Sequence, residues 1–198
     1  MKAAQSLLPK LEKIVVDIFT STEILPHMTH LTCKDFISSV DYLPNLKYLS
    51  IRKGNNNKRH QQLMEKFSEI YAPVCTLTNL ESLLLHNIIV DKDSINHLAK
   101  LTNLQHLKCH FGTFNKTQPF SLLSHIQKLE IEEASKDNLL GIIERCTKLV
   151  ELHAPLTLHY AKKWLKDIHA LNNLSDPLRN QKKVLYPIFT QENTKDTE

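Results

Sequence analysis

Several signatures of common enzyme classes are missing from this sequence of 198 residues. With only 3 glycines it has no glycine-rich phosphate loop, and it contains neither the GxSxG nucleophile elbow nor the HExxH zinc motif. No apolar run approaches the roughly 18 residues that suggest a membrane-spanning helix. The segment from Met1 to Leu11 has a lysine but no sustained apolar stretch, so we expect no signal peptide. We therefore predict no catalytic residues, no cofactor and no membrane partner.

Strong charge of one sign is also missing. The formal net charge is +4 and the pI is about 8.8, a positive bias too weak to indicate nucleic acid binding without a concentrated patch. The basic cluster in this sequence lacks interleaved aromatic residues, so we interpret it as a solvated loop and not as a platform for single-stranded nucleic acid. Its members are Arg52, Lys53, Lys58, Arg59 and His60.

The cysteine pattern excludes the simplest metal site. The four cysteines include no CxxC pair, so the sequence indicates no zinc site. Cys33 and Cys109 stand where sister segments carry Val, Ile or Leu, which predicts that both are buried as small hydrophobic residues. Free buried thiols are typical of a reducing compartment, so we expect a cytoplasmic protein.

One phrase recurs along most of the chain, and it reads Leu-x-x-Leu-x-x-Leu-x-apolar. The seven copies are LPKLEKIVV at 8–16, LPHMTHLTC at 25–33, LPNLKYLSI at 43–51, LTNLESLLL at 77–85, LTNLQHLKC at 101–109, LSHIQKLEI at 123–131 and CTKLVELHA at 146–154. Each copy ends in alternating apolar residues, which predicts a strand with one buried face. An Asn in third place can bond the backbone where the chain turns into that strand. One copy cannot bury its leucines alone, whereas stacked copies form a continuous core and a parallel sheet.

These in-phase copies resemble the leucine-rich-repeat family over roughly residues 8–155. The resemblance implies an α/β solenoid with a parallel sheet on its concave face and a mixture of helices and turns on its convex face. This chain departs from the family three residues after the last strand leucine, where the family usually has Asn or Cys. Because the regular asparagine ladder at that position is absent, we expect an irregular and variably curved solenoid.

The spacing between copies predicts what lies on the convex side. Spacings of 17 and 18 residues leave little room for a helix, whereas later spacings of 22 to 24 leave room for short helices at Ser94–Leu101 and Lys136–Cys146. The 34-residue spacing holds an inserted helix at 58–72, which Pro73 ends. We expect the solenoid, with about seven repeats, to occupy residues 1–158.

A C-terminal capping helix and segment are predicted at residues 159–190. The helix is expected to hide the exposed end of the repeat core behind its apolar stripe. That stripe consists of Tyr160, Trp164, Ile168 and Leu171. Val184–Phe189 is expected to add a final strand or packed segment, and residues 191–198 form a polar tail.

The residues that flank the buried strand positions are expected to project from the concave face, where the family usually binds its partners. Adjacent strands lie about 4.8 Å apart, so equivalent residues form three columns across the sheet. Cations and histidines occupy the columns in copies two to five and acids occupy them in copies six and seven, which predicts a face that is positive in the middle and negative toward its C-terminal end. Tyr48 and Leu84 add apolar contacts. The predicted partner-binding residues are His30, Lys34, Tyr48, Arg52, Leu84, His86, His106, Lys108, His110, Glu130, Glu132 and Glu151.

Two of these histidines, His86 and His110, fall in the same column on consecutive copies. Paired imidazoles suit a shared metal ion, but no third ligand is evident and a closed zinc site needs four, so we predict no metal site. Histidines on this face also leave open a pH-sensitive binding mode, because His titrates near neutrality. Solvated histidines are the favoured interpretation.

These features together predict a protein–protein interaction module, expected to be a monomer. Two narrower interpretations stay open. One is a secreted bacterial effector that binds a host protein in the host cytoplasm, which irregular repeats, few glycines and many lysines and asparagines favour. The other is the substrate-receptor part of a ubiquitin ligase, whose F-box would lie outside this chain. A cryptic enzyme that uses the concave histidines is a further interpretation, and the lack of a catalytic motif argues against it.

Overall fold

The computed structural model describes most of the repeat region and one segment near the C-terminus. The described residues are 11–21, 23–36, 40–53, 65–70, 72–112, 120–132, 136–156 and 184–189. They form an α/β structure in which strands alternate with short helices and turns.

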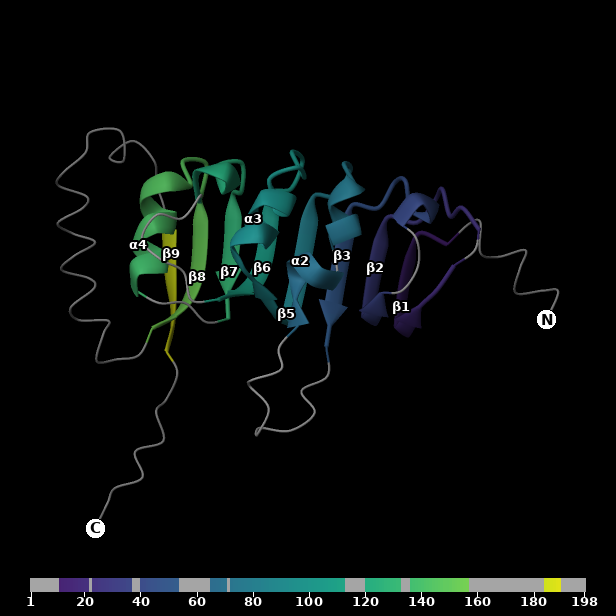
Figure 1. The fold of residues 1–198 in the computed structure, drawn as a ribbon, viewed down its shortest axis with the longest axis horizontal. Coiled ribbons are helices and arrows are strands. Elements are labelled where there is room, and N and C mark those ends of the chain that lie inside the picture. Colours follow the sequence, from purple (N-terminus) through teal and green to yellow (C-terminus); the bar gives the residue numbers. More distant parts are fainter. Residues whose placement is uncertain are drawn as a thin grey trace, which may run out of the picture.

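A nine-stranded sheet is the body of the protein (Figure 1). Its strands are β1 (Lys13–Phe19), β2 (His30–Phe36), β3 (Tyr48–Arg52), β4 (Glu65–Lys66), β5 (Ser82–Val90), β6 (His106–Phe111), β7 (Lys128–Ile131), β8 (Glu151–Leu156) and β9 (Val184–Phe189). All strands except the short β4 lie side by side in chain order, and β4 pairs with β5 outside this series. The pairings between these strands are all parallel. A stack of repeats produces this order, because each copy contributes one strand and then crosses back.

The register places equivalent residues of the repeated phrase opposite one another. The third leucine of copies two to seven pairs along the series Leu31, Leu49, Leu83, Leu107, Leu129 and Leu152. All members of this series are buried, and burying each one contributes about 1.5–3 kcal/mol. The predicted phase of these copies is confirmed, since a slip of one residue would turn every leucine to the other face.

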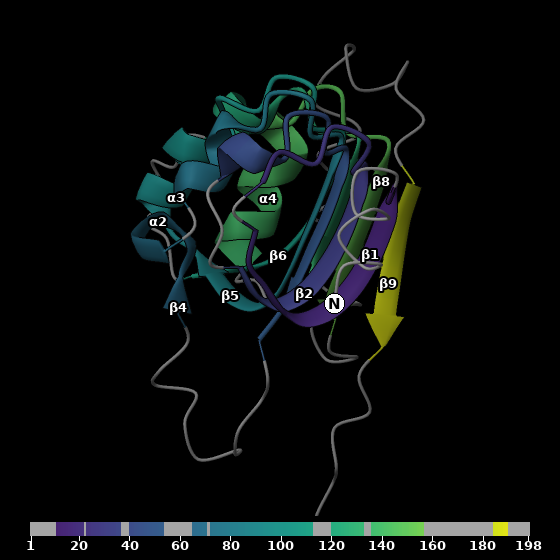
Figure 2. The ribbon, with the colours of Figure 1, turned by 90° about the vertical axis from the view of Figure 1, so that its right-hand side faces the viewer.

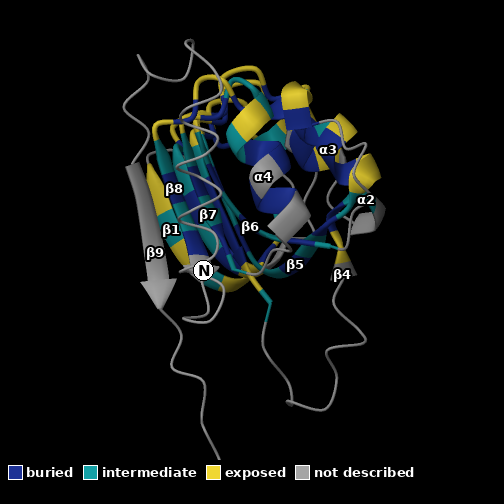
Figure 3. Ribbon diagram, turned by 90° about the vertical axis from the view of Figure 1, so that its left-hand side faces the viewer, coloured by how far each residue is buried: buried dark blue, intermediate teal, exposed yellow. Residues whose placement is uncertain are grey.

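Helices cover one face of the sheet (Figures 2 and 3). They are α2 (Phe67–Ile70), α3 (Lys92–Leu98) and α4 (Lys136–Arg145). Short 3-10 turns lie at Val40–Tyr42, Ala72–Thr76 and Phe120–Leu123. The core lies between this layer and the sheet, where Ile95, Leu98 and Ile142 meet the buried strand leucines. The prediction of a turn without a helix between copies two and three is confirmed by Val40–Tyr42.

Two of the predicted helices are present, with shifted ends. The helix expected at Ser94–Leu101 is α3, and it begins earlier because Asp91 caps it. The Asp91 side chain accepts from the Ser94 backbone N–H (2.9 Å), and the Asp91 backbone N–H donates to the Ser94 hydroxyl (3.2 Å), which together form a capping box. The helix expected at Lys136–Cys146 is α4, which ends one residue earlier.

The inserted helix expected at 58–72 is only partly present among the described residues, as α2. Residues 65 and 66 form β4, which pairs in parallel with β5, and only the single turn α2 follows. The pairing with β5 explains the difference, because it satisfies backbone groups that a longer helix would have bonded internally. Residues 54–64 lie outside the described residues.

Asparagine side chains tie each of three repeats to the one before it. The side-chain amides donate to backbone carbonyls in three bonds, from Asn45 to Pro26 (2.8 Å), from Asn79 to Pro44 (2.9 Å) and from Asn103 to Thr78 (2.8 Å). At these turns a single backbone carbonyl also accepts two hydrogen bonds. For example, the Glu81 carbonyl accepts from the backbone N–H groups of Gln105 and His106. The prediction that this asparagine bonds the backbone is confirmed. Because each acceptor lies in the preceding copy, the bonds form a ladder along the stack.

The C-terminal predictions have a mixed outcome. The final strand expected at Val184–Phe189 is confirmed as β9, which pairs in parallel with β8. The capping helix, with Tyr160, Trp164, Ile168 and Leu171, lies outside the described residues, as does the tail 191–198. Within the part of the chain that the structure describes, no helix is both long enough and apolar enough to cross a membrane.

Candidate partner-binding surface

We call the face of the sheet opposite the described helices the open face (Figure 2). Two of its three predicted columns are confirmed by the register. The first runs through Lys13, His30, Tyr48, Ser82, His106, Lys128 and Glu151. The second runs through Val15, Thr32, Ser50, Leu84, Lys108, Glu130 and His153. Residues from strands far apart in the chain therefore lie on one continuous surface.

The third predicted column is interrupted at an irregularity in β5. Its members are Asp17, Lys34, Arg52, His86, His110, Glu132 and Pro155. Leu84 pairs with Lys108, but the next paired residue of β5 is Ile89, opposite His110. Asn87 lies between them with φ at 61°, a left-handed conformation that asparagine tolerates better than most residues. The prediction that His86 and His110 stand side by side is wrong, because the irregularity sets Ile89 and not His86 across from His110.

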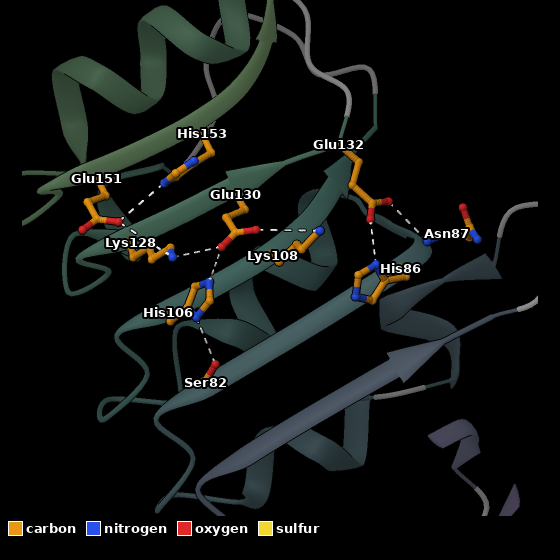
Figure 4. Close-up of polar contacts among 10 residues, drawn as sticks. All are labelled: Ser82, His86, Asn87, His106, Lys108, Lys128, Glu130, Glu132, Glu151 and His153. Carbon is orange, nitrogen blue, oxygen red and sulfur yellow. Dashed lines mark hydrogen bonds and ion pairs between the residues drawn. The ribbon is translucent and has the colours of Figure 1, made fainter. Parts of the chain in front are cut away.

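His86 pairs instead with an acid that follows β7. Its Nδ1 atom lies 3.1 Å from Oε1 of Glu132, and the Asn87 backbone N–H donates to the other carboxylate oxygen at 3.4 Å (Figure 4). Burial opposes ionisation of Glu132, but the bonds from His86 and Asn87 outweigh it and lower the pKa of the carboxyl. The Nε2 atom of His86 is buried and has no hydrogen-bond partner within the part of the chain that the structure describes. The geometry thus favours the tautomer with its proton on Nδ1.

Glu130 occupies the centre of a second set of contacts. Its carboxylate lies 3.0 Å from His106 Nε2, 3.2 Å from Lys128 Nζ and 3.7 Å from Lys108 Nζ (Figure 4). Burial again works against the charged form, yet bonds from Lys128 and His106 lower the pKa of Glu130. Burial, assisted by Lys128, lowers the pKa of His106, although Glu130 acts in the opposite direction. The His106 ring also contacts Ser82 Oγ at 3.2 Å through Nδ1.

Glu151 extends these contacts to β8. Its carboxylate lies 3.8 Å from Lys128 Nζ and 3.5 Å from His153 Nε2 (Figure 4). The contacts of Glu130, Glu132 and Glu151 together form what we call the ion-pair network. Its members are His86, His106, Lys108, Lys128, Glu130, Glu132, Glu151 and His153.

The predicted separation of charge along the face requires correction. The acids of copies six and seven reach back across the sheet to the cations and histidines of copies four to six, as the His86–Glu132 and Lys108–Glu130 contacts show. Most of the charge on this part of the face is therefore compensated within the protein. The sequence pattern did not indicate this, because column positions do not say which way a long side chain turns.

The remaining predicted residues lie in what we call the N-terminal patch, on β1, β2, β3 and the start of β5. The patch consists of Lys13, Val15, Asp17, His30, Thr32, Lys34, Tyr48, Arg52 and Leu84. The rings of His30 and Tyr48 stack with centroids 5.5 Å apart. Val15 is 79% exposed. This part of the face is more apolar than the ion-pair network and carries fewer charges.

Charge in the N-terminal patch is placed at its margins. Lys34 forms an exposed ion pair with Asp17 at 2.8 Å. Arg52 and Lys13 are exposed, and among the described residues neither makes an ion pair. Ser50, expected to project from the face, is instead fully buried, and its hydroxyl has no hydrogen-bond partner among the described residues. Serine is too short to reach the surface between larger side chains.

The predicted binding residues therefore fall into two groups. The structure brings His30, Lys34, Tyr48, Arg52 and Leu84 together in the patch. It draws His86, His106, Lys108, Glu130, Glu132 and Glu151 into the network, and it leaves His110 half-buried opposite Ile89. Sequence reasoning missed Asn87, although an asparagine before a run of apolar residues was a usable signal for a break in the strand.

The thiols and carboxylates offer no metal centre in the described part of the chain. Within it, no group of three or more His, Cys, Asp or Glu side chains has the geometry to hold an ion. All four cysteines are free and buried, as predicted for Cys33 and Cys109. Burial raises the pKa of Cys75 to about 12, and burial likewise raises that of Cys109. Neither thiol is suited to nucleophilic chemistry.

Comparison with known proteins adds no relative to this picture. No protein-family model matches the chain, and no curated protein matches it either.

Proposed function

We propose that this chain is a leucine-rich-repeat solenoid that binds a protein partner through the open face of its sheet. The observation that carries the proposal is the N-terminal patch, where exposed and half-buried side chains from four strands stand on a rigid, in-register surface. Val15, Tyr48 and Leu84 offer apolar contact, and tyrosine is among the residues that most often anchor interfaces. The parallel sheet beneath holds their spacing, which lowers the entropic cost of binding.

A charge-reversal pair provides the test. Lys34→Glu with Arg52→Glu changes two exposed cations on the open face. Lys92→Glu with Lys100→Glu makes the same change in net charge at the first residue of α3 and just after that helix. Each protein is used as bait in a cytosolic lysate, and any retained partner is purified and its Kd measured directly. We expect the open-face pair to slow association and weaken binding at least about tenfold, because such charges act mainly on the on-rate.

The control pair should leave the Kd within about twofold. Equal weakening in both pairs would mean that only overall charge matters. Weakening in the helix-side pair alone would place the interface on the other face. The cytoplasmic location and monomeric state expected from the sequence accompany this proposal as predictions. A monomer should give a single species of about 23 kDa in sedimentation.

A further inference from the structure

We propose that the N-terminal patch takes an acidic protein segment whose carboxylates flank apolar side chains. The inference rests on the proposed function and narrows it to one part of the open face and one chemistry of partner. Ion pairs are distributed unevenly over the open face of the sheet.

The charged side chains of the ion-pair network are already paired with one another, which leaves little to gain from a charged partner. Glu130 alone contacts three basic groups, from His106, Lys128 and Lys108, at 3.0–3.7 Å. Each of these side chains is at most about two-fifths exposed. A partner that docked here would have to break existing pairs and desolvate the groups it freed, which offsets the gain from new contacts.

The N-terminal patch differs in this respect. It carries three cations, Lys13, Lys34 and Arg52, against one carboxylate, Asp17, and that carboxylate is already paired with Lys34. Among the residues that the structure describes, Arg52 and Lys13 therefore have no carboxylate paired with them. A partner bearing carboxylates would supply the missing charge, and the guanidinium of Arg52 suits a bidentate contact with such a group.

Between Lys13 and Arg52 the floor of the patch is formed by apolar and hydroxyl side chains and the His30 ring. Thr32 on β2 and Leu84 on β5 are half-buried, and the buried Ser50 lies between them in the register. His30 stacks on Tyr48 in the adjacent column, and Val15 stands exposed on β1. Apolar side chains of a partner can pack on this floor while its carboxylates reach the basic margin. Electrostatic attraction and apolar burial then act on the same segment.

The same patch fits a nucleic acid poorly. Strong phosphate binding needs many cations along the backbone, and single-strand platforms need several aromatic faces for successive bases. Within the described part of the patch, Lys13 and Arg52 lie on different strands, β1 and β3, and Tyr48 is the one aromatic side chain apart from the His30 ring stacked on it. An acidic peptide is therefore the favoured occupant, and an oligonucleotide is an outcome that the test distinguishes.

Selection from a random peptide library displayed on phage, with the full chain as target, tests the inference. We expect the selected peptides to be enriched in Asp and Glu next to Leu, Phe or Trp. Synthetic copies should bind more weakly as salt rises, because screening reduces exposed charge contacts. Arg52→Glu should raise the Kd of such a peptide at least about tenfold, and Tyr48→Ala should do so independently of charge.

Two matched variants locate the binding. Lys92→Glu, the same reversal on the helix side, should change the Kd by less than about twofold. Lys128→Ala probes the ion-pair network and should be equally mild. The thermal midpoint of each variant is measured first, so that a Kd is compared only between folded proteins. Arg52→Glu changes an exposed side chain and should fold normally even where Tyr48→Ala does not.

Three results would overturn the inference. The first is selection of basic peptides or of none. The second is a Kd that responds to Lys128→Ala and not to Arg52→Glu, which would leave open-face binding in place but move it to the network. The third is tighter binding of a labelled oligo(dT) than of any acidic peptide. Binding that responds only to Lys92→Glu would instead contradict the proposed function itself.

Discussion

The Nδ1 atom of His86 on β5 lies 3.1 Å from Oε1 of Glu132, two strands away across β6. The contact forms because the irregularity in β5 takes His86 out of register with His110 and frees it to face the residue after β7. The same carboxylate accepts the Asn87 backbone N–H, so one acid contacts two adjacent residues within the irregular segment. The irregular segment of β5 and the Glu132 contacts therefore depend on each other.

Substitutions at Asn87 should separate backbone strain from hydrogen bonding. The Asn87 side chain donates to the Lys53 carbonyl at 2.8 Å, and its φ is 61°. Asn87→Gly keeps the left-handed conformation and loses only the side-chain bond, which should cost about 0.5–1.5 kcal/mol. Asn87→Ala loses the bond and adds strain of about 1 kcal/mol or more. Urea unfolding measures both, and an alanine variant as stable as the glycine variant would contradict the assigned conformation.

Glu132→Ala tests the other side of the same unit. The change leaves the Asn87 N–H and His86 Nδ1 without their acceptor, so we expect a loss of about 1–3 kcal/mol in the free energy of unfolding. The comparison is Asp93→Ala, which removes an exposed acid from the first turn of α3 and should cost less than about 1 kcal/mol. Equal effects would show that the Glu132 contacts do not stabilise the fold.

The strand register can be tested by truncating leucine and valine on opposite faces. Leu83 is fully buried, whereas Val15 is 79% exposed. Leu83→Ala should lower the free energy of unfolding by about 2–5 kcal/mol through lost burial and the cavity left behind. Val15→Ala should stay within about 0.5 kcal/mol of the parent protein. Similar losses of stability in the two variants would contradict the burial of Leu83 and the exposure of Val15, and with them the strand register.

The sequence predicted the sheet far better than the site. Alternation of buried residues leaves one phase for each strand, which is why Leu49, Leu83 and Leu107 line up as expected. The irregularity at Asn87 involves a left-handed residue and contacts with Lys53 and Glu132, which periodicity does not encode. Likewise, Ser50 is buried because of the size of its neighbours, and the acids turn toward cations on other strands. Such properties arise only when the copies are packed together.

The side-chain hydrogen bonds of Asn45, Asn79 and Asn103 to the preceding repeat should each contribute modestly to stability. Asn79→Ala removes the bond to the Pro44 carbonyl, which is exposed to solvent, so we expect a cost of about 0.5–1.5 kcal/mol. Asn96→Ala is the control, because Asn96 is exposed within α3 and alanine favours helix there. Urea unfolding of both variants gives the comparison. A loss at Asn96 as large as that at Asn79 would argue against a structural role for the ladder.

Acidification should destabilise the protein in two stages. Burial lowers the pKa of His106 from 6.5, so the folded state favours the neutral ring and the unfolded chain takes up the proton first. The contribution of the neutral His106 ring to stability is fully present above pH 6.5. It is lost as the pH falls through the pKa of His106 in the folded protein. The pKa values of Glu130 and Glu132 are lowered from 4.5 in the folded protein, despite burial, by bonds from Lys128 and His86. The contribution of these two carboxylates to stability is present above pH 4.5. It is lost as the pH falls through their pKa values in the folded protein.

Urea unfolding at a series of pH values checks both stages against matched variants. His106→Gln should remove part of the decline that begins as the pH falls below 6.5, because the variant has no ring to protonate at this site. Glu130→Gln should reduce the decline below about pH 4.5 and leave the upper stage present, because only the carboxyl has been removed. The informative quantity is the difference between parent and variant, since it cancels titration elsewhere in the chain. A difference that stays constant from neutral to acid pH for both variants would show that neither group is perturbed by folding.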